Sequence, residues 1–181
     1  MKKILTIIVF TLIFNQAVSA TFLDIFKVES GLSIHAVDNH RPYLGPNLGL
    51  ILSLESINFI FATRAGFDPF STKMNVQGLL TFEYEYVLSQ VPIGILAAIS
   101  MGYSNVESAP SKDGVLFQAY IGAIYPLNQT LDVVSKIYGS FRGSSTSSTN
   151  ATGQKQFLGT AGIGIDFGFR FSFSPNWKLK Y

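Results

Sequence analysis

Two glutamates, Glu83 and Glu85, stand two positions apart in a stretch where apolar and polar residues alternate. Such alternation predicts a β-strand, in which residues two apart lie on the same face. Two carboxylates on one face can serve as general acid and general base. The alternative is that each is paired with a cation inside the protein. We favour this second interpretation, because buried charges need partners.

Ser33 and His35 also share one face of a predicted strand, an arrangement that could support a serine hydrolase. The spacing of the surrounding residues identifies no acid that would orient His35. A nucleophile and a base without a third group make a weak case for catalysis. We therefore expect the protein not to be an enzyme.

The sequence has few residues that could bind a metal or a cofactor. The only two histidines are His35 and His40, and His40 has Asp38 beside it, whereas zinc sites use three or four protein ligands. The chain has no cysteine, which excludes thiolate metal sites and disulfides. The glycine pair Gly162 and Gly164 lies within a strand pattern, not in the strand–turn–helix setting of a phosphate loop. The sequence predicts no metal and no cofactor.

The clearest alternation runs from Phe157 to Phe173. Its odd positions are apolar or small and end in four phenylalanines, while its even positions are small, polar or charged, apart from Leu158. A strand with so many aromatic residues on one side favours a lipid-facing position, because aromatic residues gather where a membrane barrel meets the water boundary.

Eight stretches alternate in this way, and most have about the 9–11 residues that a tilted membrane strand needs. They are residues 26–36, 44–54, 57–67, 74–86, 93–103, 115–125, 131–141 and 157–173. The connections alternate between shorter turns and longer, more polar loops, as they do in outer-membrane barrels. The polar, low-complexity run Gly143–Gly153 is predicted to be a mobile external loop.

The start of the chain has the pattern of a secretory signal peptide. Lys2 and Lys3 precede an apolar run from Ile4 to Phe14, and Val18–Ala20 provides small residues for cleavage after Ala20. The apolar run is too short to cross about 30 Å of hydrocarbon as a helix. We expect residues 1–20 to be removed and residues 21–181 to form one domain in the outer membrane of a Gram-negative type bacterium.

The composition agrees with this localisation. Without Lys2 and Lys3 the 13 lysines and arginines fall to 11, equal to the 11 aspartates and glutamates, so nothing indicates a nucleic-acid partner. An exported, aromatic-rich chain without membrane helices satisfies its backbone hydrogen bonds in lipid by closing into a barrel. The predicted fold is all-β, an eight-stranded antiparallel up-and-down transmembrane β-barrel.

On this pattern, its length and its aromatic last strand, the mature chain resembles the small eight-stranded outer-membrane barrels, typified by the membrane domain of outer-membrane protein A and its stand-alone relatives. The resemblance implies contact with outer-membrane lipid and with the barrel-assembly machinery, which recognises a terminal aromatic residue. The residues that match such a signal are Phe169, Phe171, Phe173 and Tyr181. Residues 174–181 either extend the last strand or form a short periplasmic tail.

The polar face of these strands turns inward in such a barrel, whose interior is only wide enough for side chains to fill. Charges on that face should therefore form an ionic network, and they are Lys27, Glu29, Arg64, Glu83, Glu85, Asp132, Lys136, Asp166 and Arg170. Because the first and last strands close the barrel, we predict a direct contact between Glu29 and Arg170.

Three functions remain open at this point. The first is a non-enzymatic outer-membrane barrel that stabilises the envelope or contacts a surface partner through its external loops. The second is a narrow transport route for small apolar molecules. The third is a secreted, lipocalin-like barrel with its apolar residues inside, where they would hold a ligand.

Overall fold

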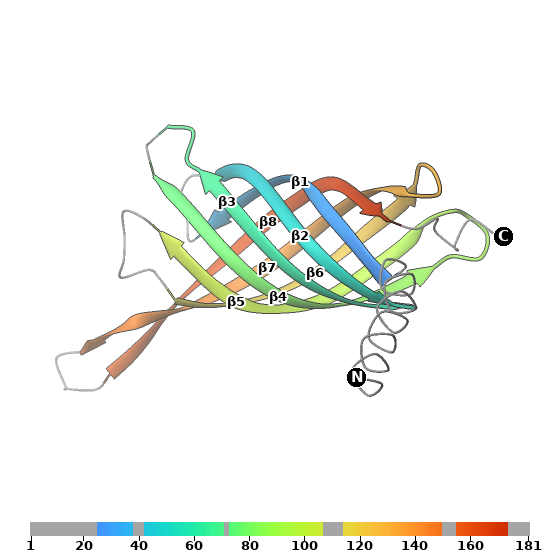
Figure 1. Ribbon diagram of the computed structural model, residues 1–181. Helices are drawn as coiled ribbons and strands as arrows, with labels where there is room; N and C mark the ends of the chain where they lie inside the picture. The colour runs from blue at the N-terminus through green and yellow to red at the C-terminus, as the bar shows by residue number, and fades with distance from the viewer. Residues whose placement is uncertain (1–24, 38–41, 71–72, 107–113, 150–154, 174–181) are drawn as a thin grey trace, which may run out of the picture.

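The computed structural model describes residues 25–37, 42–70, 73–106, 114–149 and 155–173. Eight strands follow one another, and they are β1 (Phe26–Val37), β2 (Tyr43–Leu54), β3 (Ile57–Phe67), β4 (Met74–Val87), β5 (Gly94–Val106), β6 (Gly114–Pro126), β7 (Leu131–Thr149) and β8 (Lys155–Ser172). Each strand pairs antiparallel with the next, and β8 pairs with β1, so the sheet is a closed barrel (Figure 1). The predicted fold is confirmed. Among the described residues, no helix is long and apolar enough to cross a membrane.

The two faces of the barrel wall differ as the alternation predicts, because successive side chains of a strand point to opposite faces. In β4 the residues alternate between buried and exposed along almost the whole strand. Every strand places large apolar side chains on the outside. Examples that are between 47% and 67% exposed, one taken from each strand, are Leu32, Leu48, Phe61, Leu80, Ile99, Ile121, Ile137 and Ile163.

The inside is not entirely polar. Leu96, Tyr120, Ile124, Val134 and Tyr138 form a buried apolar cluster contributed by β5, β6 and β7. Charged and polar side chains fill much of the remaining interior. A barrel of eight strands has room inside for little but side chains, so its interior is a packed core.

Glycines in the barrel wall leave space for large interior side chains that pack against the backbone. A Cβ on Gly164 would lie 2.3–2.7 Å from the phenol ring of Tyr138. At the seam between β1 and β8, Gly31 lies opposite Gly168, and a Cβ on Gly31 would lie 2.2 Å from the carbonyl oxygen of Phe167. The two closing strands therefore approach each other over residues without side chains.

The last two strands are longer than the sequence pattern indicates. β7 continues through Gly143 to Thr149, and β8 begins at Lys155, so much of the predicted external loop Gly143–Gly153 is paired strand. The prediction of a loop was wrong for residues 143–149, because backbone pairing does not depend on alternating side chains, and residues 150–153 lie outside the described residues. A register shift lies between Gly143 and Ser147, and beyond it the two strands project as a ribbon past the rest of the barrel (Figure 1).

The barrel has two distinct ends. At the turn end, where β1 begins and β8 finishes, the connections are Glu55–Ser56 and residues 88–93 and 127–130. At the loop end they are residues 38–42, 68–73, 107–113 and 150–154. The contrast in length is smaller than expected, because β7 and β8 absorb most of the last loop. The predicted signal peptide (residues 1–20), residues 174–181 with Tyr181, and His40 lie outside the described residues.

Candidate functional site: the charged interior

Arg170 is the centre of a cluster of charges in the turn-end half of the barrel. Its side chain is fully buried. Nη2 donates to Oε2 of Glu29 at 2.8 Å, and Nη1 lies 3.0 Å from Oε1 of Glu83. Glu85 is 3.8 Å away across the same guanidinium. The predicted contact between Glu29 and Arg170 is present, because the register of β1 and β8 places these two residues directly opposite each other.

Lys136 adds a second cation to this cluster. Its ammonium group forms an ion pair with Glu29 and lies 3.9 Å from Oε2 of Glu83. It also stands over the ring of Tyr120, 5.0 Å from the centroid, in a cation–π contact. Glu29 and Glu83 are thus each held by both Arg170 and Lys136, which is how buried carboxylates remain charged.

Two neutral residues also donate hydrogen bonds to the carboxylate of Glu83. The hydroxyl of Tyr120 donates to its Oε2 at 2.5 Å, and Nδ2 of Asn58 donates to its Oε1 at 2.7 Å. Sequence reasoning missed both as members of the network, because only charged residues were selected. Both residues lie at inward-facing positions of their strands, and this position in the alternating pattern could have identified them.

Arg64 and Asp166 form a second cluster nearer the middle of the barrel. Nη2 of Arg64 donates to Oδ2 of Asp166 at 2.5 Å, and Nη1 donates to Oε1 of Gln118 at 2.6 Å. The guanidinium lies over the ring of Tyr138, 4.3 Å from its centroid. The predicted charges therefore divide between two clusters. Lys27 and Asp132 are also buried, in the turn-end half.

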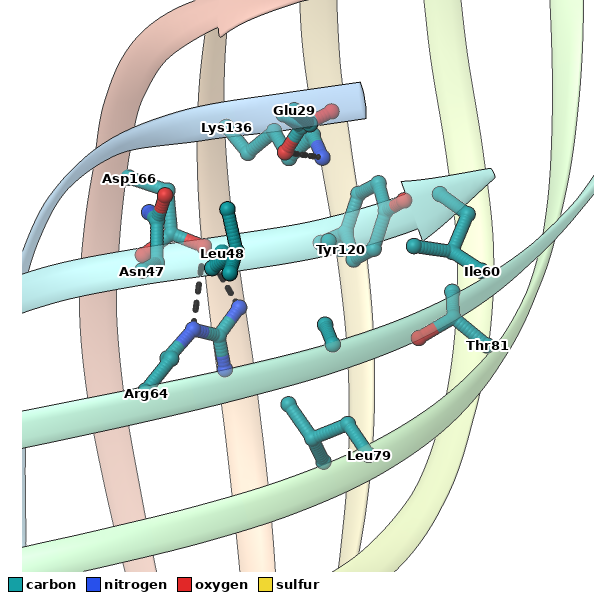
Figure 2. Close-up of a pocket in the computed structure, with 12 residues that line it drawn as sticks. Glu29, Asn47, Leu48, Ile60, Arg64, Leu79, Thr81, Tyr120, Lys136 and Asp166 are labelled. Carbon is teal, nitrogen blue, oxygen red and sulfur yellow. Dashed lines mark hydrogen bonds and ion pairs between the residues drawn. The ribbon is translucent and has the colours of Figure 1, made fainter. Parts of the chain in front are cut away.

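A small cavity separates the two clusters. Figure 2 shows the ion pair of Glu29 and Lys136 on one side of it and the pair of Arg64 and Asp166 on the other. Its volume is about 20 Å³. Since one water molecule needs roughly 10–15 Å³, the cavity has room for about one water.

Polar residues at the loop end make a third group. Nε2 of His35 bonds to Oδ1 of Asn75 at 3.0 Å, and Asn75 in turn donates to Ser104. The ring of His35 stacks on Tyr43. Ser33 bonds instead to the hydroxyl of Tyr138 at 3.1 Å. In the described part of the chain, Ser33 and His35 therefore have different hydrogen-bond partners and do not form a catalytic pair.

Three of the four aromatic residues predicted as an assembly signal are described by the structure, and they lie on the outside. Phe169, Phe171 and Phe173 are each about half exposed, and Phe171 and Phe173 meet edge to face with centroids 5.7 Å apart. The last strand ends at Ser172, next to Phe173. These rings form part of the apolar outer surface, which is the reverse of a lipocalin-like barrel with its apolar residues inside; that alternative is wrong.

Comparisons with known proteins bear on the fold. No protein-family model matches the chain, and no curated protein matches it. The crystal structure of Neisserial surface protein A (NspA) is similar with a TM-score of 0.61 and 11% sequence identity, over 81% of this chain and 96% of that chain. The outer membrane protein OprG from Pseudomonas aeruginosa aligns with a TM-score of 0.48 and 9% identity, over 81% of this chain and 94% of that one. The chain therefore has the fold of the small eight-stranded outer-membrane β-barrels that its sequence resembles.

Proposed function

We propose that the protein is a non-enzymatic barrel of a bacterial outer membrane that stabilises the envelope or contacts a surface through its loop end. The observation that carries this proposal is the combination of an apolar outside with an interior filled by paired charges. A surface of this kind suits lipid. The localisation rests also on the signal-peptide pattern of residues 1–20.

The interior favours this function over transport. Arg170 and Glu83 are completely buried and joined across the barrel from β8 to β4. The cavity between the two charge clusters has room for about one water. An apolar molecule crossing the barrel would have to separate these ion pairs, at a cost of several kcal/mol for each uncompensated charge. We expect single-channel recordings in planar bilayers to show no steady conductance.

The ribbon formed by the ends of β7 and β8 supports a contact role, because it extends the loop end beyond the barrel (Figure 1). Gly143 pairs directly with Gly159. A variant in which Asn-Gly replaces residues 144–158 therefore removes the ribbon and closes the hairpin with a two-residue turn.

The test compares this variant with the parent chain in a strain that lacks the protein. Detergent sensitivity measures envelope stability, and attachment to a solid surface measures contact. A variant that restores detergent resistance but not attachment identifies the ribbon as the contact element, and one that restores both identifies a structural barrel. Wild-type detergent resistance and attachment in the deletion strain would refute the proposal.

A further inference from the structure

The small cavity between the two charge clusters is a part of the interior that the ion pairs do not fill. Its volume of about 20 Å³ exceeds the roughly 10–15 Å³ that one water molecule needs. Ile60, Ala62 and Leu79 form an apolar part of its wall, and charged and neutral polar side chains from both clusters form the rest. Cavities with polar groups in the wall are the kind that water occupies, whereas wholly apolar cavities stay dry.

The charges that line this cavity cancel. Within the described residues they are two carboxylates, Glu29 and Asp166, and two cations, Arg64 and Lys136. An ion in so small a space would lie close to charges of its own sign and would have no net charge to balance. The wall therefore suits an occupant that is neutral, as small as one water, and able both to donate and to accept hydrogen bonds.

Both cations have N–H groups to spare. In the part of the chain that the structure describes, Arg64 donates twice to Oδ2 of Asp166 and once to Oε1 of Gln118. A guanidinium has five N–H groups, so two remain. Lys136 donates to Oε1 of Glu29 with one of the three N–H groups of its ammonium. A small acceptor in the cavity could therefore be bound from either side.

The carboxylates have acceptor capacity to match. Asp166 is only 4% exposed, and its Oδ1 has no hydrogen-bond partner among the described residues. Buried polar atoms of this kind are normally satisfied by protein or by ordered water. On the other side of the cavity, Oε1 of Glu29 accepts one hydrogen bond, from Lys136, and retains a lone pair.

We propose that this cavity is the binding site of one structural water molecule, which joins the two charge clusters. The water donates to Asp166 and to Glu29, and it accepts from Arg64 or Lys136. The two clusters are then one hydrogen-bonded network that extends from the turn-end half to the middle of the barrel. A buried water with about three such bonds is costly to remove, so it is part of the fold. The inference holds for either role of the loop end.

A crystal structure of the protein in detergent, at a resolution that shows ordered water elsewhere in the interior, tests this directly. We expect one peak of water density in the cavity, at about 2.7–3.2 Å from at least one polar atom of each cluster. A cavity without density would overturn the proposal. So would a water that bonds to one cluster alone, because it would not join the two.

Ala62 lines the cavity and allows a matched pair of variants. Ala62→Thr and Ala62→Val introduce side chains of nearly the same shape, but only the threonine hydroxyl can replace a hydrogen bond of the displaced water. We expect both variants to lose the water peak. In urea titrations in detergent micelles, we expect the unfolding equilibrium constant of Ala62→Val to be about ten times that of Ala62→Thr. Ala62→Val at least as stable as Ala62→Thr would overturn the proposal, because a methyl group is the better filler of a dry cavity.

Gly49→Ala is a smaller change that also narrows the cavity, and it serves if the Ala62 variants do not fold. A Cβ on Gly49 would lie 3.3 Å from Cγ2 of Ile60 and 3.7 Å from Cβ of Glu29. The control is Gly139→Ala, whose Cβ meets nothing within 4 Å and which carries the same general effect of replacing a strand glycine. We expect Gly49→Ala to unfold at lower urea concentration than Gly139→Ala, because it displaces the water without replacing its bonds. The opposite order, as for filling an empty void, would overturn the proposal.

Discussion

At the scale of single residues, Arg170 stabilises the interior because it neutralises carboxylates from the neighbouring strand β1 and from β4 across the barrel. Glu29, Glu83 and Glu85 all lie within 3.8 Å of its guanidinium. Removing one partner of a buried ion pair costs about 3–5 kcal/mol, since the other charge is left uncompensated. We predict that Arg170→Met lowers the free energy of unfolding by about this amount, measured by urea titration in detergent micelles.

The matched control for this prediction also removes one of the orphaned charges. In the double variant Arg170→Met with Glu83→Gln, much of the lost stability should return, because Glu83 no longer carries a charge and Glu29 keeps its ion pair with Lys136. A single variant as stable as the parent would show that Arg170 does not balance these carboxylates.

Gly164 and Gly139 provide a second comparison of individual residues. A side chain on Gly164 points inward against the ring of Tyr138, whereas a side chain on Gly139 meets nothing within 4 Å. Overfilling a packed interior costs about 1–3 kcal/mol. We predict that Gly164→Val lowers stability by this amount while Gly139→Val is neutral within about 0.5 kcal/mol. Equal effects in urea titrations would contradict the assignment of the two faces.

At the scale of strands and turns, the connection Glu55–Ser56 contains the one backbone strain seen in the described residues. Glu55 has a φ of 54°, and it is the single described non-glycine residue with a positive φ. This conformation costs a residue with a side chain roughly 1–2 kcal/mol. We predict that Glu55→Gly raises the temperature of unfolding, whereas Ser56→Gly does not. A lower unfolding temperature for Glu55→Gly would contradict this prediction.

The strands were predictable from the sequence wherever the two faces differ chemically. Phe157–Phe173 alternates phenylalanine and isoleucine with small and charged residues, so its faces could be assigned directly. Gly143–Thr149 consists of glycine, serine and threonine, which have no apolar face to mark a strand. Its pairing with β8 depends on backbone hydrogen bonds that alternation does not encode.

The interior contacts were predictable only between neighbouring strands. Glu29 and Arg170 lie on β1 and β8, whose pairing follows from closure of the barrel. The contact of Arg170 with Glu83 crosses the interior from β8 to β4, and that of Arg64 with Asp166 crosses from β3 to β8. Such contacts depend on the tilt and stagger of the closed barrel, which spacing along the chain does not give.

At the scale of the whole molecule, the outside and the inside of the barrel both fit a barrel that is surrounded by lipid. The outside presents large apolar side chains from every strand, and the inside places its charges in pairs and clusters. A water-soluble barrel would require the reverse arrangement of its faces. Exposed apolar area of this extent is stable where lipid covers it.

Gel mobility of the protein from an outer-membrane fraction, with and without boiling in detergent, tests whether this chain is a closed barrel of an outer membrane. We expect to find the protein in this fraction and expect the unboiled protein to migrate differently from the boiled one, because a barrel with all its strands paired resists detergent until it is heated. A protein recovered from the soluble periplasm, with the same mobility before and after boiling, would contradict this expectation.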